Sequence, residues 1–157
     1  MAYGHHRHSA SGHAQETDAD PKAKSDADRL PGRRRVLVVE DEPLIAFDLI
    51  SEIEAGDHEV IGHCRTADEA IAMAGRERPD VTVMDIGLLG EQSGLDAARK
   101  IREAYGIGCV FVSATLDRVD PKQWGDIEPL ALIAKPYRDE ALDQAIRQSR
   151  TTDARRA

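Results

Sequence analysis

Five short apolar runs, spaced between residues 35 and 150, constrain the fold of this chain more than any other feature. Each run has the length of a buried strand, and all but the fourth are followed by apolar residues at helical spacing. The runs cover residues 36–39, 59–64, 81–84, 109–112 and 130–134. Strands joined by helical crossovers lie parallel, so the pattern predicts an α/β fold whose sheet is covered on both faces.

The connecting segments carry recognisable helix boundaries. Thr66 and Ser93 each begin a capping-box pattern, and glycines stop the predicted helices. The predicted helices cover residues 43–56, 66–75, 93–106 and 138–148. Between the last two strands, Pro121 interrupts any long helix, although Asp120 can cap a short helix that has the proline at its first position. We therefore expect a short or irregular fourth helix.

The charge is uneven along the chain. The formal net charge is −8, and residues 35–150 alone carry 13 basic and 23 acidic side chains. An acidic body argues against binding nucleic acid or an anionic membrane surface, since both need a basic face. The longest wholly apolar run has about five residues, too few for a transmembrane helix. The two cysteines, Cys64 and Cys109, are too few for a disulfide scaffold, so we expect reduced thiols and a cytoplasmic protein.

Residues 1–34 differ in composition from the rest of the chain. They contain no valine, isoleucine or phenylalanine, so we predict a disordered tail that is rich in histidine, alanine and aspartate. Four histidines, His5, His6, His8 and His13, are compatible with a weak transition-metal site or with a solvated tail. The predicted organisation is completed by one domain over residues 35–150 and a flexible tail over residues 151–157.

Polar residues follow four of the five predicted strands. They are Glu40 and Asp41 after the first, Asp85 after the third, Ser113 after the fourth and Lys135 after the fifth. Ligands of open α/β sheets bind at this edge of the sheet, and the convergence favours the flavodoxin-like doubly wound (βα)5 order 2-1-3-4-5. Three neighbouring carboxylates repel one another, and a hard divalent cation such as Mg²⁺ relieves the repulsion.

This set of side chains suits phosphoryl transfer. The carboxylate of Asp85 is ionised at neutral pH and can act as nucleophile without a general base. Lys135 and Ser113 can then contact the phosphoryl oxygens. Taken singly, the same residues also fit local roles: an acidic helix start, a turn, a cap and a solvated lysine. Their joint occurrence at successive strand ends favours the site.

With these residues in place, the sequence resembles the receiver domain of two-component response regulators over residues 34–149. The motifs are Val38-Val-Glu-Asp-Glu-Pro43, Val83-Met-Asp-Ile86, Val112-Ser-Ala114 and Ala134-Lys-Pro136. The resemblance implies that Asp85 is the phosphoacceptor for a histidine kinase or a histidine phosphotransfer protein. It further implies that Mg²⁺ is held by Asp41, Glu40, Asp85 and the backbone carbonyl of Gly87, and that Ser113 and Lys135 sense the phosphoryl group.

The chain departs from the usual receiver pattern in two places. The loop after Asp85 is about one residue longer than usual and lacks a proline, and Leu132 stands where many receivers have a switch aromatic. Tyr137 or Trp124 is a candidate substitute, and Trp124 fits either local packing or a partner contact. Together with the irregular fourth helix, these departures put the usual output surface in doubt. They are similar to stress-response receivers that carry a sigma-factor-like partner domain.

We therefore expect a single-domain response regulator, because only seven residues follow the last predicted helix. Such a phosphoprotein acts by protein contact on an unknown target, as part of a phosphorelay, as a phosphate sink or by binding that target. It is not an enzyme beyond its own phosphorylation and dephosphorylation. The alternatives are a phosphorylation-independent interaction module of the same fold and a haloacid-type phosphatase, whose Asp-x-Asp pair is replaced here by residues 40–42.

Overall fold

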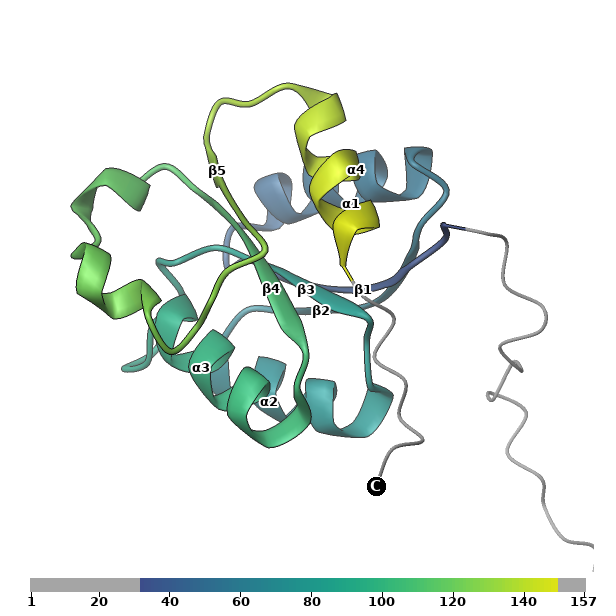
Figure 1. Cartoon of the computed structure of the whole chain (residues 1–157). Coiled ribbons are helices and arrows are strands. Elements are labelled where there is room, and N and C mark those ends of the chain that lie inside the picture. The colour runs from purple at the N-terminus through teal and green to yellow at the C-terminus, as the bar shows by residue number, and fades with distance from the viewer. Residues whose placement is uncertain (1–31, 150–157) are drawn as a thin grey trace, which may run out of the picture.

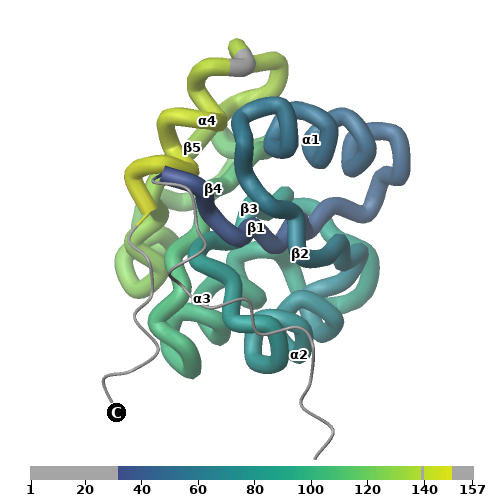
Figure 2. The backbone as a smooth tube through the Cα atoms, turned by 90° about the vertical axis from the view of Figure 1, so that its right-hand side faces the viewer, coloured from purple at the N-terminus to yellow at the C-terminus, as the bar shows by residue number. Residues whose placement is uncertain are grey.

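The computed structural model describes residues 32–149. Residues 1–31 and 150–157 lie outside the described residues. They include the four N-terminal histidines, most of the predicted N-terminal tail and the predicted C-terminal tail. Arg34, which we assigned to the tail, contacts the folded body, because its Nε donates a hydrogen bond to the carbonyl of Ser149 at 3.1 Å. The two ends of the described chain are therefore neighbours (Figure 2).

Five parallel strands form a single sheet at the centre of the molecule (Figure 1). Their order is β2-β1-β3-β4-β5, which confirms the predicted flavodoxin-like arrangement. The strands are β1 (Arg35–Val39), β2 (Glu59–Cys64), β3 (Val81–Met84), β4 (Gly108–Ser113) and β5 (Ala131–Ala134). Each lies within about a residue of its predicted bounds, because all five apolar runs become sheet positions.

Helices cover both faces of the sheet and enclose two apolar layers (Figure 1). The helices are α1 (Pro43–Ala55), α2 (Ala67–Glu77), α3 (Gly94–Tyr105) and α4 (Asp139–Gln148). Side chains alternate along β1, so Val36 and Val38 pack in the layer with α1 and α4, whereas Leu37 and Val39 pack in the layer with α2 and α3. In the described part of the chain, no helix has both the length and the apolar character of a membrane span.

One predicted capping box and one predicted helix end need correction. Ser93 forms the complete capping box, but at Thr66 only half of it forms, because the Glu69 carboxylate accepts from the backbone of Arg65 instead. The second helix does not stop at Gly75 but continues to Glu77. Gly75 serves a packing role there, since a Cβ atom would lie 2.5 Å from the Tyr105 hydroxyl on α3.

The segment between β4 and β5 is irregular, as predicted. It forms two 3₁₀ helices, η2 (Leu116–Arg118) and η3 (Pro121–Trp124). The Asp120 carboxylate accepts a hydrogen bond from the backbone of Lys122 at 2.9 Å, and the proline occupies the first helical position. Trp124 is half-buried and packs edge-on against Phe111, with ring centroids 5.1 Å apart. This contact supports the local-packing interpretation of Trp124.

Candidate functional site

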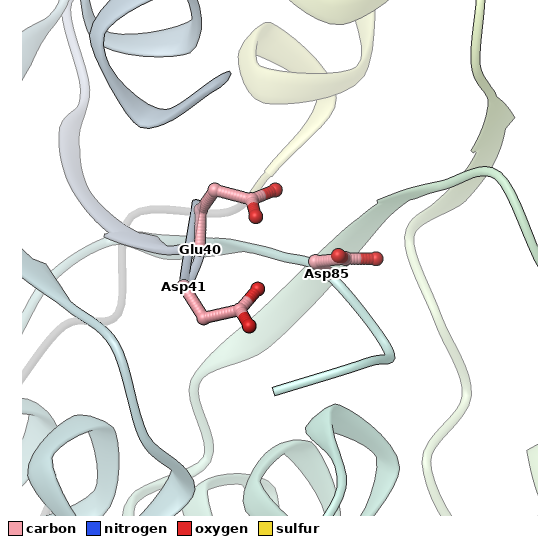
Figure 3. Close-up of side chains that lie close together, drawn as sticks. All are labelled: Glu40, Asp41 and Asp85. Carbon is pink, nitrogen blue, oxygen red and sulfur yellow. The ribbon is translucent and has the colours of Figure 1, made fainter. Parts of the chain in front are cut away.

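Three carboxylates converge at the carboxyl ends of β1 and β3 (Figure 3). Glu40, Asp41 and Asp85 each offer one oxygen atom, and these atoms lie within 4.8 Å of one another. Among the side chains that the structure describes, no other three acidic, histidine or cysteine groups come this close. Because β1 and β3 are neighbours in the sheet, the loops that follow them have to meet here. The sequence-predicted acidic cluster therefore forms.

Glu40 is the buried member of the cluster. Its side chain has no exposed surface, and burial raises its pKa, while hydrogen bonding from Lys135 opposes that rise. The Glu42 backbone donates to Oε1 at 3.1 Å, and the Lys135 ammonium donates to Oε2 at 2.9 Å. The negative charge of Asp85 adds to the rise. Lys135 thus lies in the site as predicted, and its charge is paired with Glu40.

Asp85 is half-buried and is fixed through its backbone. Its N–H donates to the carbonyl of Val39 at 2.9 Å, which continues the ladder between β1 and β3. One carboxylate oxygen accepts from the backbone of Ile86 at 2.7 Å. Gly94, at the start of α3, donates to the carbonyl of Ile86 at 2.8 Å and closes the long loop tightly. Gly87 lies exposed in that loop, and its carbonyl as a metal ligand stays a prediction.

Ser113 ends β4 and is buried. Its hydroxyl lies 3.2 Å from the hydroxyl of Thr115 and accepts from the Thr115 backbone at 3.3 Å. The backbone of Lys135 donates to the Ser113 carbonyl at 3.1 Å, so the ends of β4 and β5 are joined, and the peptide bond that follows Lys135 is cis. Sequence reasoning missed Thr115, although its spacing of two residues from Ser113 is typical of a hydroxyl turn.

The donor set fits a hard divalent cation. Three carboxylates supply only oxygen ligands, and two of them, Asp41 and Asp85, are partly open to solvent, which leaves room for water or phosphoryl oxygens. Neither cysteine contributes, because Cys64 and Cys109 are both free and buried in the core. The residues present therefore suit Mg²⁺ better than a softer metal.

Leu132, at the position where a switch aromatic was expected, leaves 45% of its surface exposed on β5. Tyr137 does not fill the same place, since its hydroxyl donates to Glu52 on α1 at 2.9 Å. Trp124 lies on the same face of the sheet as Leu132, because Leu132 pairs in register with Phe111, and the Trp124 ring packs edge-on against Phe111. Tyr137 thus lies on the α1 side of the sheet, whereas Trp124 as a substitute for the switch aromatic stays a prediction.

Comparison with known proteins agrees with this geometry. Residues 36–147, well over half of the chain, match the family described as response regulator receiver domain. The phyllosphere-induced regulator PhyR of Methylorubrum extorquens is 36% identical over 115 residues, covering 73% of this chain and 42% of that protein. Protein PilH of Pseudomonas aeruginosa is 30% identical over 116 residues, covering 71% of this chain and 93% of PilH.

A solved structure, that of the response regulator PhyR from Brucella abortus, superposes with a TM-score of 0.66 at 35% identity. The superposition covers 74% of this chain and 47% of that one. The chain thus spans less than half the length of either PhyR protein. Fold, acidic cluster and sequence similarity all agree, and the chain belongs to the family of response regulator receiver domains.

Proposed function

We propose that the chain accepts a phosphoryl group on Asp85 from a histidine kinase or a histidine phosphotransfer protein, in a Mg²⁺-dependent reaction, and signals by protein contact. The observation that carries the proposal is the convergence of three carboxylates with the Lys135 ammonium at one sheet edge. The alternative of a passive module with the same fold has no use for such a cluster, whose mutual repulsion has a cost in stability.

The reaction needs little from the protein beyond positioning. A carboxylate oxygen of Asp85 attacks phosphorus, the bond from phosphorus to the donor nitrogen breaks, and its electron pair returns to the imidazole ring. Bound Mg²⁺ would supply positive charge to the phosphoryl oxygens. Lys135 holds an ammonium at the same edge, and the buried Ser113 holds a hydroxyl there. Both groups stabilise the negative charge that the phosphoryl group brings.

An apolar surface beside the site supports a protein as the phosphoryl donor. Leu44 and Phe47 lie in the first turns of α1, which begins directly after the acidic residues of β1. Their side chains are 82% and 68% exposed. Two large apolar side chains left open at adjacent helical positions are suited to cover by a partner. Transfer from a macromolecular donor needs such a surface, whereas a small phosphomonoester does not.

The test is phosphorylation by a small donor. The wild-type chain, incubated with acetyl phosphate and Mg²⁺, should gain one phosphoryl group in its intact mass, and hydroxylamine should remove it. The Asp85→Asn variant should gain none, and EDTA should abolish labelling of the wild type. Asp126→Asn, which changes an exposed aspartate outside the cluster, is the matched control and should label normally.

Two outcomes would refute the proposal. Absence of an adduct from acetyl phosphate and also from phosphoramidate, with no effect of EDTA, would favour a phosphorylation-independent module. Steady hydrolysis of a phosphomonoester that depends on Asp85 would instead indicate a phosphatase.

A further inference from the structure

Two side chains from the end of β2 hold the loop that carries the acidic pair. Nε2 of His63 lies 2.8 Å from the backbone carbonyl oxygen of Glu40. Nε of Arg65 donates to the backbone carbonyl of Asp41 at 3.2 Å. Arg65 is itself fixed, because its backbone donates to the Glu69 carboxylate at 2.9 Å. Both basic side chains thus contact the backbone of the predicted metal ligands without belonging to the acidic cluster.

The sheet topology explains why side chains are needed at this point. The last backbone bond between the two strands runs from the Glu40 N–H to the Cys64 carbonyl, at 3.0 Å. Beyond it the chain turns into α2, whose N-cap is Thr66. The ladder therefore ends before it can pair the next carbonyls of the β1 loop, and His63 and Arg65 supply the donors instead. A carbonyl only accepts hydrogen bonds, so Nε2 of His63 carries a proton in this contact.

Fixing these carbonyls fixes the directions of the carboxylates. Rotation of the peptide that follows Glu40 would break the bond to His63, and rotation of the peptide that follows Asp41 would break the bond to Arg65. A divalent cation binds more tightly when its ligands are held in place beforehand. The two bonds therefore act on the metal through the loop, without contact between the basic side chains and the cation.

We propose that His63 and Arg65 are positioning residues for the divalent cation at the acidic cluster. The inference builds on the metal dependence in the proposed function and deepens it. Loss of the bond from His63 should weaken cation binding by about tenfold, the lower end of the range for groups that orient metal ligands.

The test measures binding of Mn²⁺, as a spectroscopic substitute for Mg²⁺, by electron paramagnetic resonance of the unphosphorylated full chain. The apparent Kd should rise about tenfold for His63→Ala. It should recover most of the way for His63→Gln, whose amide nitrogen reaches a similar position and can donate. Melting curves in metal-free buffer would show that all variants are folded. An unchanged Kd for His63→Ala, or an equal loss for His63→Gln, would overturn the role of His63.

Arg65 allows a test with opposed electrostatic and positional effects. Arg65→Ala removes a positive charge near the carboxylates, and this change alone would tighten cation binding. Weaker binding by Arg65→Ala can therefore come only from the lost hydrogen bond and would support the proposal, whereas tighter or equal binding would overturn it for Arg65. Arg76→Ala is the matched control, because it removes the same charge from the last turn of α2, at the far end of that helix.

The two proposals fail in distinguishable ways. If the wild type binds Mn²⁺ and the variants bind it weakly, but acetyl phosphate leaves no adduct on Asp85, the phosphoacceptor proposal fails and the positioning role stands. If Asp85 is labelled normally and the His63 and Arg65 variants bind Mn²⁺ like the wild type, the positioning role alone fails. A wild type that binds no Mn²⁺ overturns the positioning role and the metal dependence together.

Discussion

Gly94 offers a sharp test of how the loop after β3 holds the phosphoacceptor. It is buried at the first position of α3, and its N–H donates to the carbonyl of Ile86 at 2.8 Å. A Cβ atom built at this position would lie 1.9 Å from the carbonyl oxygen of Asp85 and 2.9 Å from its carbonyl carbon. Since backbone atoms cannot rotate aside as a side chain can, Gly94→Ala has to displace the loop that carries Asp85.

The magnitude follows from the size of the overlap. A displacement of about 1 Å is needed to bring the new contact out to the shortest that proteins tolerate, and overpacking of this kind costs about 1–3 kcal/mol. Breaking the hydrogen bond to Ile86 adds about 1 kcal/mol. The free energy of unfolding should therefore fall by about 3 kcal/mol, which lowers the melting temperature of a domain of this size by roughly 10–15 °C. A misplacement of about 1 Å at Asp85 should also slow phosphorylation about a hundredfold.

Urea titration, calorimetric melting and the rate of labelling by acetyl phosphate measure these effects. Gly125→Ala is the matched control, because it also lacks a positive φ and its nearest atom, the carbonyl oxygen of Lys122, is 3.7 Å away. That control should melt close to the wild type, or slightly above it through reduced entropy of the unfolded chain. If Gly94→Ala melts and reacts like Gly125→Ala, the close approach of α3 to the backbone of Asp85 is not what holds the site.

Three further outcomes are expected. Asp85→Asn should raise the melting temperature of the metal-free chain by a few degrees, because it removes a charge that repels Glu40. Mg²⁺ should then stabilise this variant less than the wild type, and calorimetry in EDTA and in Mg²⁺ measures both effects. Burial lowers the pKa of His58, so the unfolded chain binds a proton first, and the wild type should lose stability as pH falls below about 6.5. In urea titrations the free energy of unfolding of His58→Gln should fall less over this range, and an equal fall would contradict the prediction. Burial raises the pKa of Cys64 to about 11 and that of Cys109 to about 12. Iodoacetamide at pH 8 should therefore modify neither thiol until urea unfolds the chain, and mass spectrometry measures the modification.

Much of the fold could be predicted because its signals are local. The runs at 59–64 and 81–84 coincide with β2 and β3 residue for residue. The central strand β3 is fully buried and almost wholly apolar, whereas the edge strand β2 is mostly half-buried and includes Glu59 and His63. Pro121 interrupted the fourth helix as its missing N–H requires. The end of α2 was mistaken, because Gly75 looks like a helix stop, whereas its lack of a side chain serves the approach of Tyr105 from a distant helix. That purpose lies in tertiary packing and leaves no local signal.

The acidic cluster was equally predictable, because the topology of a parallel sheet brings every strand end to one edge. Glu40, Asp41 and Asp85 therefore had to meet once the strands were recognised. Chain order alone does not reveal which partner each group takes. Lys135 was expected to await a phosphoryl group, and in the structure its ammonium is bound to the Glu40 carboxylate at 2.9 Å.

The sequence by itself determined the strands, their parallel sheet and the set of chemical groups at its edge, since apolar periodicity and strand-end residues are properties of short segments. Only the tertiary structure decided how those groups are held. The contacts of His63 with Glu40 and of Arg65 with Asp41 join residues that are 23 and 24 positions apart. They exist because the β1–β2 ladder ends at Cys64 and leaves two carbonyls in need of donors. Where a ladder ends depends on the register of two strands, which is a property of the folded sheet and not of either segment.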